Sequence, residues 1–318
     1  MKYVFFLSGE NVKIAEAEVL SLAKCYGEII SWELDERVLT LDFNGENFFE
    51  RLAFSHEVSE LFSICSFSEI EKEFSKMNID GTCCVRATGI GIKVNENVER
   101  KLGEILWKKG ARIKLENPKN LIRVYLTPKR CYIGFLVFRQ KKKQFLEREP
   151  NKRPFFMPIV TLPKFSRALV NLAAIKSGKI LDPMCGTGSF LIEAGLMKLE
   201  IFGMDYYRDI VYGCRENLEF YGLEGELVQG DVRSMPFKED SFEAIVTDYP
   251  YFKATRKGSE EDLYEKSLQE ISRVLKKKKR AVIVTNQEIE DFPLKLVYRF
   301  TQRVHGSLTR RIYVLEKD

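Results

Sequence analysis

The sequence predicts an α/β protein whose C-terminal half is a doubly wound parallel sheet with an antiparallel hairpin at one edge. From residue 164 onward, five apolar segments of four or five residues alternate with longer helical segments, which is typical of consecutive β-α-β units. The last two apolar segments are separated by only four residues, which include His305-Gly306, and this short connection indicates an antiparallel pair. All of these segments lie at 179–182, 200–204, 226–229, 243–247, 281–285, 296–304 and 309–315.

The composition is that of a folded, soluble chain. Its 318 residues correspond to two domains of roughly 150 residues each. Hydrophobic residues make up 45% and charged residues 31% of the chain, which excludes a wholly disordered protein. We expect no transmembrane span and no secretory leader, because no apolar run reaches ~18 residues. Seven cysteines without a C-x-x-C spacing argue against a disulfide framework or zinc site, so we expect a cytoplasmic location and no metal.

The N-terminal part of the chain predicts two smaller α/β units. In the first, an apolar strand precedes a helix with apolar residues at helical spacing, and two strands follow. In the second, apolar strands flank one helix, and Gly89 and Gly91 interrupt the strand before it. The predicted strands lie at 2–7, 28–33, 37–43, 59–67, 82–88, 121–126 and 131–138, and the predicted helices at 11–25 and 95–108.

These elements predict how the chain is divided. The first unit occupies residues 1–55 and the second unit residues 56–140. Residues 141–163 carry four prolines and many charges, and because proline density disfavours both helix and sheet, we expect a linker there. The doubly wound sheet then occupies residues 164–318.

Charge is distributed unevenly along the chain, although the net charge is only +5. Residues 1–80 carry 7 basic and 16 acidic side chains, whereas residues 101–153 carry 16 basic and 4 acidic side chains. Aromatic residues such as Tyr125 and Phe135 are interspersed in this basic block. A basic block with interspersed aromatic residues favours a nucleic-acid partner over a plain solvated face.

A glycine-rich turn follows the first strand of the doubly wound half, in the sequence LDPMCGTGSF (181–190). Gly186 and Gly188 allow the backbone to approach a ligand closely, and Asp182 provides an acid at the strand end. The turn lacks the G-x-x-x-x-G-K-[ST] of a phosphate-binding loop and the third glycine of G-x-G-x-x-G. It therefore favours a ligand with an amine or hydroxyl groups over a bound phosphate.

Acidic residues also follow the next two strands. Asp205 comes about twenty residues after the turn, where a carboxylate can accept both hydroxyls of a ribose. Asp231 can accept an adenine exocyclic amine. Three acids after three consecutive strands fit an adenosine with an amino-acid-like tail better than three helix caps, so we predict S-adenosylmethionine as the cofactor. The predicted cofactor-binding residues are Asp182, Cys185, Gly186, Gly188, Asp205, Tyr206, Asp231 and Val232.

The fourth strand ends in TDYPY (247–251), which predicts chemistry on the exocyclic amine of a base. Such an amine is a poor nucleophile because its lone pair is delocalised into the ring. The Asp248 carboxylate and the Tyr249 carbonyl can accept its two N–H groups and turn the lone pair toward a methyl donor, while Pro250 fixes the loop. Tyr251 can stack on a base that has left its helix. We therefore predict these four residues as the catalytic set.

The residues match a known family. The part from Lys164 to the C-terminus resembles class I S-adenosylmethionine-dependent amino-methyltransferases, whose signature is (D/N)-P-P-Y, and the whole chain resembles the archaeal tRNA guanine-10 N2-methyltransferases. The resemblance implies ferredoxin-like and THUMP RNA-binding domains before a Rossmann-like catalytic domain. It implies methylation of guanosine 10 in tRNA at N2 to N2-methylguanosine, and whether a second methyl group follows to give N2,N2-dimethylguanosine stays open. The segments that carry it are CCVRAT (83–88), 116–138, 153–173 and HGSLTRRIYVLE (305–316).

Tyr249 departs from the family signature, which has proline at this position. Because the position contributes a backbone carbonyl, we expect the reaction to be unchanged and the loop to be less rigid. The other matched residues imply a methionine-binding turn (Asp182, Gly186, Gly188), a ribose ligand (Asp205), an adenine ligand (Asp231) and a target-base site (Asp248, Pro250, Tyr251).

The basic block fits a tRNA partner that is held by its shape and phosphates, away from the reacting base. We predict contacts from the linker, and further contacts from the lysine-rich stretch 276–280. We expect a monomer without membrane attachment, and the need for a small activator subunit stays open. The predicted RNA-binding residues are Lys141, Lys142, Lys143, Arg148, Lys152 and Arg153.

Three alternative functions remain compatible with the sequence. A tRNA guanine N2-methyltransferase of the same architecture could act at another position, although such enzymes typically have N-x-P-Y where this chain has Asp248. A DNA adenine N6-methyltransferase shares the catalytic loop but needs no THUMP-like half. A non-catalytic RNA-binding or assembly protein could retain a degenerate methyltransferase fold, although the intact acids argue against it.

Overall fold

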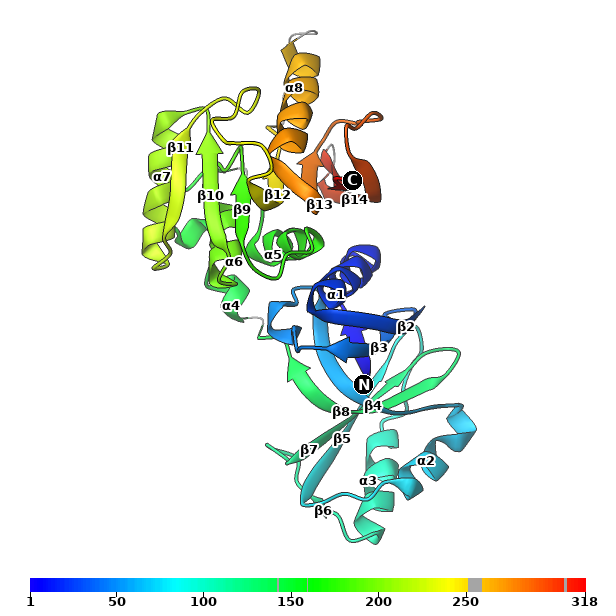
Figure 1. Cartoon of the computed structure of the whole chain (residues 1–318). Helices are drawn as coiled ribbons and strands as arrows, with labels where there is room; N and C mark the ends of the chain where they lie inside the picture. The colour runs from blue at the N-terminus through cyan, green and yellow to red at the C-terminus, as the bar shows by residue number, and fades with distance from the viewer. Residues whose placement is uncertain (142, 159, 251–258, 306–307) are drawn as a thin grey trace. The chain divides into compact units, whose positions relative to one another are not determined.

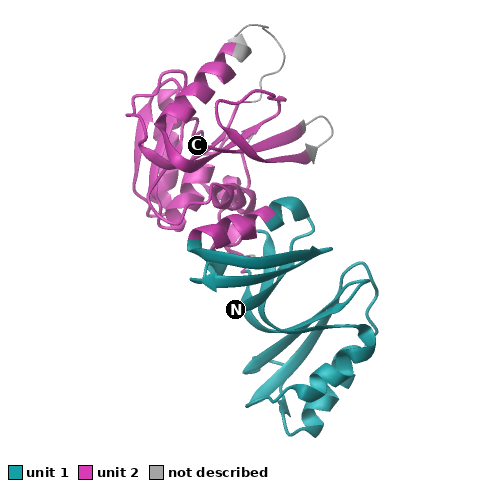
Figure 2. Cartoon of the chain, turned by 45° about the vertical axis from the view of Figure 1, so that its right-hand side comes forward, with its two compact units in different colours: residues 1–16, 26–50, 54–140 teal, residues 17–25, 51–53, 141–318 magenta. Residues whose placement is uncertain are grey.

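The chain forms two compact units in the computed structural model, which describes residues 1–318 except 142, 159, 251–258 and 306–307. They are shown in teal and magenta in Figure 2. Unit 1 comprises residues 1–16, 26–50 and 54–140, and unit 2 comprises residues 17–25, 51–53 and 141–318.

Unit 1 is built on one eight-stranded sheet. In chain order its strands are β1 (Lys2–Leu7), β2 (Gly27–Asp35), β3 (Val38–Gly45), β4 (Ser55–Cys65), β5 (Thr82–Gly89), β6 (Arg112–Ile113), β7 (Asn120–Leu126) and β8 (Cys131–Arg139). Their order in the sheet is β2-β3-β1-β4-β8-β7-β5-β6. Because β4 pairs with β1 on one side and with β8 on the other, it joins the strands predicted for 1–55 and for 56–140 in a single sheet.

Two helices bury the core beneath the β5–β8 part of this sheet. Helix α3 places Leu102 and Leu106 one turn apart on its buried face, where they meet Val124 of β7, and α2 adds Phe74. Full burial of each such side chain stabilises the fold by roughly 1.5–3 kcal/mol. The helical segments with residues in unit 1 are α1 (Val12–Tyr26), η1 (Phe49–Arg51), η2 (Phe67–Glu69), α2 (Ile70–Lys76) and α3 (Val98–Lys108).

Unit 2 contains a seven-stranded sheet that confirms the predicted fold class (Figure 1). Its strands are β9 (Lys179–Asp182), β10 (Glu200–Asp205), β11 (Gly225–Gln229), β12 (Phe242–Asp248), β13 (Leu275–Thr285), β14 (Lys295–His305) and β15 (Leu308–Glu316). Their order is β11-β10-β9-β12-β13-β15-β14. Strands β9 to β13 pair in parallel, and β15 pairs antiparallel with both β13 and β14, as the sequence predicted for the edge hairpin.

Helices pack against this sheet and carry part of its core. Leu181 of β9 and Ile245 of β12 share a buried cluster with Leu268 and Ile271 of α8. The segment predicted as a linker contains a short helix and a 3-10 turn, so it is more structured than its proline content suggested. The helical segments of unit 2 are α4 (Lys143–Leu146), η3 (Pro150–Lys152), α5 (Pro163–Leu172), α6 (Ser189–Leu196), α7 (Arg208–Phe220) and α8 (Ser259–Val274).

Strand β13 starts earlier than the predicted segment 281–285, and its ladder to β12 contains an irregularity. Phe242 pairs with Leu275 and Ala244 pairs with Arg280, and Lys278 between them has a φ of +58°. Arg280 is buried, and its guanidinium pairs with Glu316 at 2.9 Å. The expectation that Arg280 contacts RNA is therefore wrong, since its charge is neutralised inside the unit.

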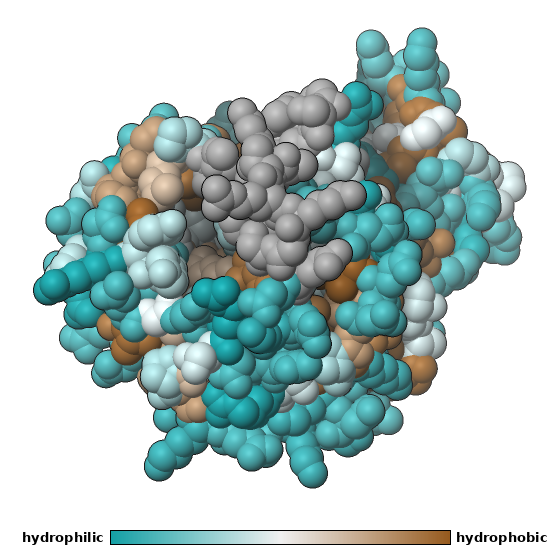
Figure 3. All heavy atoms as spheres, turned by 90° about the horizontal axis from the view of Figure 1, so that it is seen from above, coloured by the Kyte–Doolittle hydropathy of each residue, from teal (hydrophilic) through white to brown (hydrophobic). Residues whose placement is uncertain are grey.

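A helix that spans a bilayer must be both long and apolar. None of the helices in the described ranges is long and apolar enough to cross a bilayer. On the face shown in the space-filling view, hydrophilic side chains cover most of the described surface, with smaller apolar areas between them (Figure 3).

Candidate active site

Three acidic residues meet at the carboxyl ends of neighbouring parallel strands of unit 2. Asp182 ends β9, Asp205 ends β10 and Asp248 ends β12. Strand β9 pairs with both β10 and β12, so the chain order reverses between β9 and β12. In a doubly wound sheet, ligands bind in the crevice at this reversal. The structure thus brings together acids that are far apart in the sequence.

Residues 183–188, which we call the cofactor turn, fold from β9 onto the neighbouring strand β10. The Cys185 N–H donates to the Met204 carbonyl at 2.8 Å, and the Gly186 N–H donates to the Asp205 carboxylate at 3.0 Å. Gly186 has a φ of +50°, and a Cβ there would point into open space. Gly188 has a φ of +82°, and a Cβ there would lie 2.8 Å from the Cys214 sulfur. Glycine is required at position 188, where a Cβ would clash, and the open space at Gly186 leaves room beside Asp205 for a ligand.

Asp182 lies in an unusual environment for a carboxyl group. It is 2% exposed, and burial raises its pKa to about 8, with further contributions from Asp205 and Asp248. The hydrogen bond from the Met184 N–H, at 3.2 Å, and the nearby Thr247 side chain oppose this shift only in part. A buried carboxyl group is stabilised as the anion when a cation binds beside it. The ammonium group of an amino-acid-like ligand provides such a cation, so this site fits the methionine end of S-adenosylmethionine.

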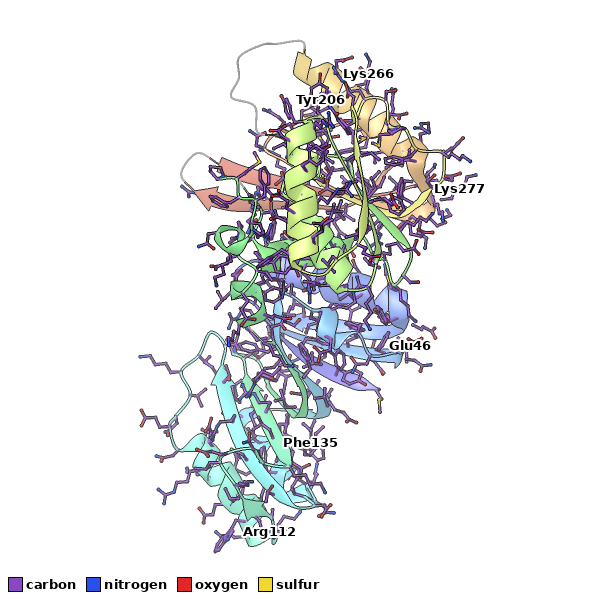
Figure 4. All side chains as sticks on the ribbon, turned by 90° about the vertical axis from the view of Figure 1, so that its left-hand side faces the viewer. Glu46, Arg112, Phe135, Tyr206, Lys266 and Lys277 are labelled. Atoms are coloured by element: carbon purple, nitrogen blue, oxygen red, sulfur yellow. The ribbon has the colours of Figure 1, made fainter. Side chains whose placement is uncertain are left out.

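Asp205 is the last residue of β10, so its carboxylate lies at the carboxyl end of that strand. Burial raises the pKa of its carboxyl, although the Tyr207 N–H also donates to it at 3.1 Å. The neighbouring Tyr206 is 60% exposed and lies at the end of the unit where α7 begins (Figure 4). The Asp205 carboxylate and the exposed ring of Tyr206 are thus adjacent, as a nucleoside-binding site requires.

Asp231 follows β11 and differs from the other acids. Both of its carboxylate oxygens accept hydrogen bonds from the Arg233 guanidinium, at 2.6–3.1 Å, and these bonds lower its pKa. The adjacent Val232 is buried. Asp231 is thus held as an anion by Arg233 in the free protein.

Cys185 belongs to the cofactor turn but is 5% exposed. Its hydrogen bond with Cys214 and its burial raise the pKa of its thiol well above the ordinary value. A thiol that stays protonated is a poor nucleophile. Cys185 therefore supports the turn by packing.

The predicted catalytic loop begins at Asp248, whose carboxylate accepts a hydrogen bond from the Thr161 hydroxyl at 3.0 Å. The Tyr249 side chain is 1% exposed: its ring stacks on Tyr264 at 4.6 Å between centroids, and its hydroxyl lies 2.5 Å from that of Ser267. The Tyr249 N–H also donates to the Val284 carbonyl at 2.8 Å. In place of the proline of the family signature, a buried aromatic side chain thus anchors this loop. Pro250 is exposed, and the predicted stacking residue Tyr251 lies outside the described residues.

The described members of the predicted RNA-binding set differ in exposure. Lys141, Lys143 and Lys152 are exposed, and Lys142 lies outside the described residues. The prediction does not hold for Arg148 and Arg153, because both guanidinium groups are engaged inside unit 2. Arg148 pairs with the fully buried Glu193 at 2.7 Å, and Arg153 is 5% exposed and donates to Ser189 at 2.8 Å.

Sequence reasoning missed two residues that support the site. Thr161 was assigned to the linker, yet it contacts Asp248. Asn217, in the middle of α7, donates to the Thr187 carbonyl of the cofactor turn at 2.9 Å. Nothing in the local pattern marks a buried asparagine in a helix as a contact of a distant turn. The segment RPFFMPIVTLP around Thr161 did carry part of the family resemblance.

Comparisons with known proteins agree with this geometry. The model of the RMKL-like methyltransferase domain family matches residues 150–306. Among solved structures, TrmN from Thermus thermophilus superposes with a TM-score of 0.55 at 20% identity, and the match covers 100% of both chains. At this level of identity the likeness establishes the methyltransferase fold.

Curated relatives match at higher identity. The tRNA (guanine(10)-N2)-dimethyltransferase of Pyrococcus abyssi is 35% identical over 99% of both chains. The enzyme of the same name from Methanothermobacter thermautotrophicus is 33% identical over 84% of both chains. The tRNA (guanine(6)-N2)-methyltransferase of Archaeoglobus fulgidus is 24% identical over 74% of this chain and 63% of its own. The acids lie at the strand ends of a methyltransferase fold, and the match to the Pyrococcus abyssi enzyme covers nearly the whole of both chains. This chain therefore belongs to the family of archaeal tRNA (guanine(10)-N2)-dimethyltransferases.

Proposed function

We propose that this protein transfers methyl groups from S-adenosylmethionine to N2 of guanosine 10 in tRNA, giving N2-methylguanosine and then N2,N2-dimethylguanosine. The observation that carries the proposal is the meeting of Asp182, Asp205 and Asp248 at adjacent strand ends, with Tyr249-Pro250 directly after Asp248. The full-length similarity to the Pyrococcus abyssi enzyme supports the choice of target.

On the cofactor side, we assign each of three acids to a different part of S-adenosylmethionine. S-adenosylmethionine supplies a methyl group bonded to a positively charged sulfur. Asp182 would hold the ammonium group of the methionine end, Asp205 the ribose hydroxyls and Asp231 the adenine amine. Gly186 and Gly188 keep the cofactor turn open beside Asp205.

On the substrate side, Asp248 and the carbonyl oxygen of Tyr249 would accept the two N–H groups of the guanine amine. This turns the nitrogen lone pair toward the methyl carbon. With the cofactor bound, the amine would accept its methyl group as the sulfur–carbon bond breaks, and the nitrogen would then lose one proton. Catalysis of this kind consists mainly of positioning, and the buried side chain of Tyr249 supports it by fixing the backbone directly after Asp248.

For tRNA binding, we propose that residues 1–55 and 56–140 act as ferredoxin-like and THUMP domains, which strand β4 at the start of the second range joins in a common sheet. We propose phosphate contacts from the exposed Lys141, Lys143 and Lys152. The active form is proposed to be the monomer, and a requirement for a small activator subunit would appear as stimulation of the purified chain by such a subunit.

The alternative of another tRNA position is less well supported. The guanine-6 enzyme of Archaeoglobus fulgidus is 24% identical, whereas the guanine-10 enzyme of Pyrococcus abyssi is 35% identical over a larger share of the chain. The carboxylate at Asp248 also favours position 10, because asparagine is typical of the sister enzymes.

The decisive experiment measures transfer of labelled methyl from S-adenosylmethionine to tRNA transcripts. We expect modification of a wild-type transcript, none of a transcript with guanosine 10 replaced by adenosine, and none of duplex DNA. In Asp248→Ala, we expect transfer to fall by about 100-fold or more, while S-adenosylmethionine still binds. Full activity of Asp248→Ala would overturn the mechanism, modification at another nucleotide would overturn the target, and absence of cofactor binding by the wild type would indicate a non-catalytic protein.

A further inference from the structure

The contact between Thr161 and Asp248 joins two parts of unit 2 that are far apart in the sequence. The Thr161 hydroxyl donates to one oxygen of the Asp248 carboxylate at 3.0 Å, and Thr161 is 5% exposed. At this low exposure, solvent competes little for the hydroxyl. A hydroxyl–carboxylate hydrogen bond is stronger than a neutral one and restricts rotation of the carboxylate.

Thr161 is itself held in place by the residues that follow it. Its carbonyl accepts a hydrogen bond from the buried Ser166 side chain at 3.4 Å, in the first turn of α5. The following Leu162 is extended, with φ of −66° and ψ of 147°, as expected for a residue before Pro163. The threonine therefore reaches Asp248 from a fixed backbone at the start of a buried helix.

The same segment is anchored at its other end beside the cofactor turn. The Arg153 guanidinium donates to the Ser189 hydroxyl at 2.8 Å, at the first residue of α6. The Phe155 backbone N–H and carbonyl both bond to the Asn217 side chain, at 3.0 and 2.9 Å. Residues 153 and 155 thus contact Ser189 and Asn217 beside the cofactor turn, and Thr161 contacts Asp248 at the start of the target-base loop.

We propose that Thr161 is a positioning residue for methyl transfer: its hydroxyl orients the Asp248 carboxylate toward the amine of the target base. Thr161 acts through Asp248, without contact to the substrate or cofactor. The proposal rests on the proposed function, in which Asp248 accepts an N–H group of the target amine.

The test compares Thr161→Val, which keeps the shape and removes the hydroxyl, with Thr161→Ser, which keeps the hydroxyl. We expect kcat to fall by about 10- to 100-fold in Thr161→Val, with the Kd for S-adenosylmethionine and the KM for tRNA within about twofold of wild type. Thr161→Ser should recover kcat to within about threefold. Thr40→Val is the matched control, since Thr40 also donates through its hydroxyl, to the Glu33 carbonyl, but lies in unit 1.

A double-mutant cycle with Asp248→Asn separates a positioning role from a general effect on packing. If Thr161 acts through the carboxylate, Thr161→Val should cause little further loss of kcat in the Asp248→Asn background under single-turnover conditions. Additive losses, or equal losses in Thr161→Val and Thr161→Ser with both proteins folded, would overturn the positioning role. Wild-type kcat in Thr161→Val with an inactive Asp248→Ala would refute this inference alone, whereas an active Asp248→Ala would refute the proposed function itself.

Discussion

The side-chain amide of Asn217 donates to the backbone carbonyl of Thr187 at 2.9 Å, so a residue of helix α7 fixes the backbone of the cofactor turn. Asn217 is fully buried, and its other hydrogen bonds go to the backbone of Phe155. One amide therefore fixes both the cofactor turn and the segment that leads to α5. These hydrogen bonds stabilise the conformation of the cofactor turn, so its backbone can lie open to a ligand.

Replacing Asn217 by aspartate should weaken cofactor binding. The carboxylate can still accept from the Phe155 N–H, but it cannot donate to the two carbonyl groups. We expect the Kd for S-adenosylmethionine to rise by about tenfold or more, with little change in tRNA affinity, as measured by calorimetry. Asn120→Asp is the matched control, because Asn120 also donates to two backbone carbonyls, in unit 1. An unchanged Kd in a folded Asn217→Asp protein would show that the turn does not depend on this contact.

Asp182→Asn should have opposite effects on stability and on binding. The folded-state pKa of about 8 lies above the ordinary 3.8, so between these values the folded protein keeps a proton that the unfolded chain releases. The free energy of unfolding therefore falls as pH rises through this window, by up to about 1.4 kcal/mol per pH unit. Asparagine carries no titrating proton, so without cofactor the variant should be more stable than wild type at pH 8. It should also bind S-adenosylmethionine more weakly.

Urea unfolding at several pH values between 5 and 8, combined with cofactor titration, checks this prediction. Asp291→Asn, at an exposed position, serves as the control for the loss of one acidic group. Parallel stability curves for wild type and Asp182→Asn would mean that the carboxyl is charged in the free protein.

Tyr249→Pro restores the residue of the family signature, yet it should destabilise this chain. Proline cannot donate to the Val284 carbonyl, and the substitution removes the stacking on Tyr264 and the hydroxyl contact with Ser267. We expect a loss of about 3 kcal/mol or more in the free energy of unfolding, against about 1 kcal/mol for Tyr249→Phe. Equilibrium unfolding of the two variants measures the difference. Wild-type stability of Tyr249→Pro would show that the loop is anchored by other residues.

Charge reversal at Lys141, Lys143 and Lys152 should weaken tRNA binding and reduce its dependence on salt. Each lost phosphate contact should lower the slope of log K against log salt by about 0.7–0.9. The control is reversal of three exposed lysines elsewhere in unit 2, Lys24, Lys198 and Lys238, which changes the net charge equally. Equal salt slopes for the two triple variants would indicate a general effect of charge rather than contacts at the segment 141–152.

The interior of unit 2 was predictable because local patterns determine it. The alternation of apolar strands with helices required a parallel sheet, and in such a sheet the residues that follow each strand meet at one edge. The positions of Asp182, Asp205 and Asp248 follow from this rule alone. The roles of Arg148 and Arg153 did not follow, because a run of basic residues in the sequence does not show which charges find a buried partner such as Glu193.

By itself, the sequence determined the fold class of the C-terminal half, the glycine requirement of the cofactor turn and the acid at each strand end, since these depend on spacing along the chain. Only the tertiary structure decided which distant side chains support the site: Thr161 on Asp248, Asn217 on Thr187, and the buried ring of Tyr249 on Tyr264. Such contacts join residues from 15 positions to more than 80 positions apart along the chain. Their geometry depends on how the helices pack against the sheet, which no local pattern encodes.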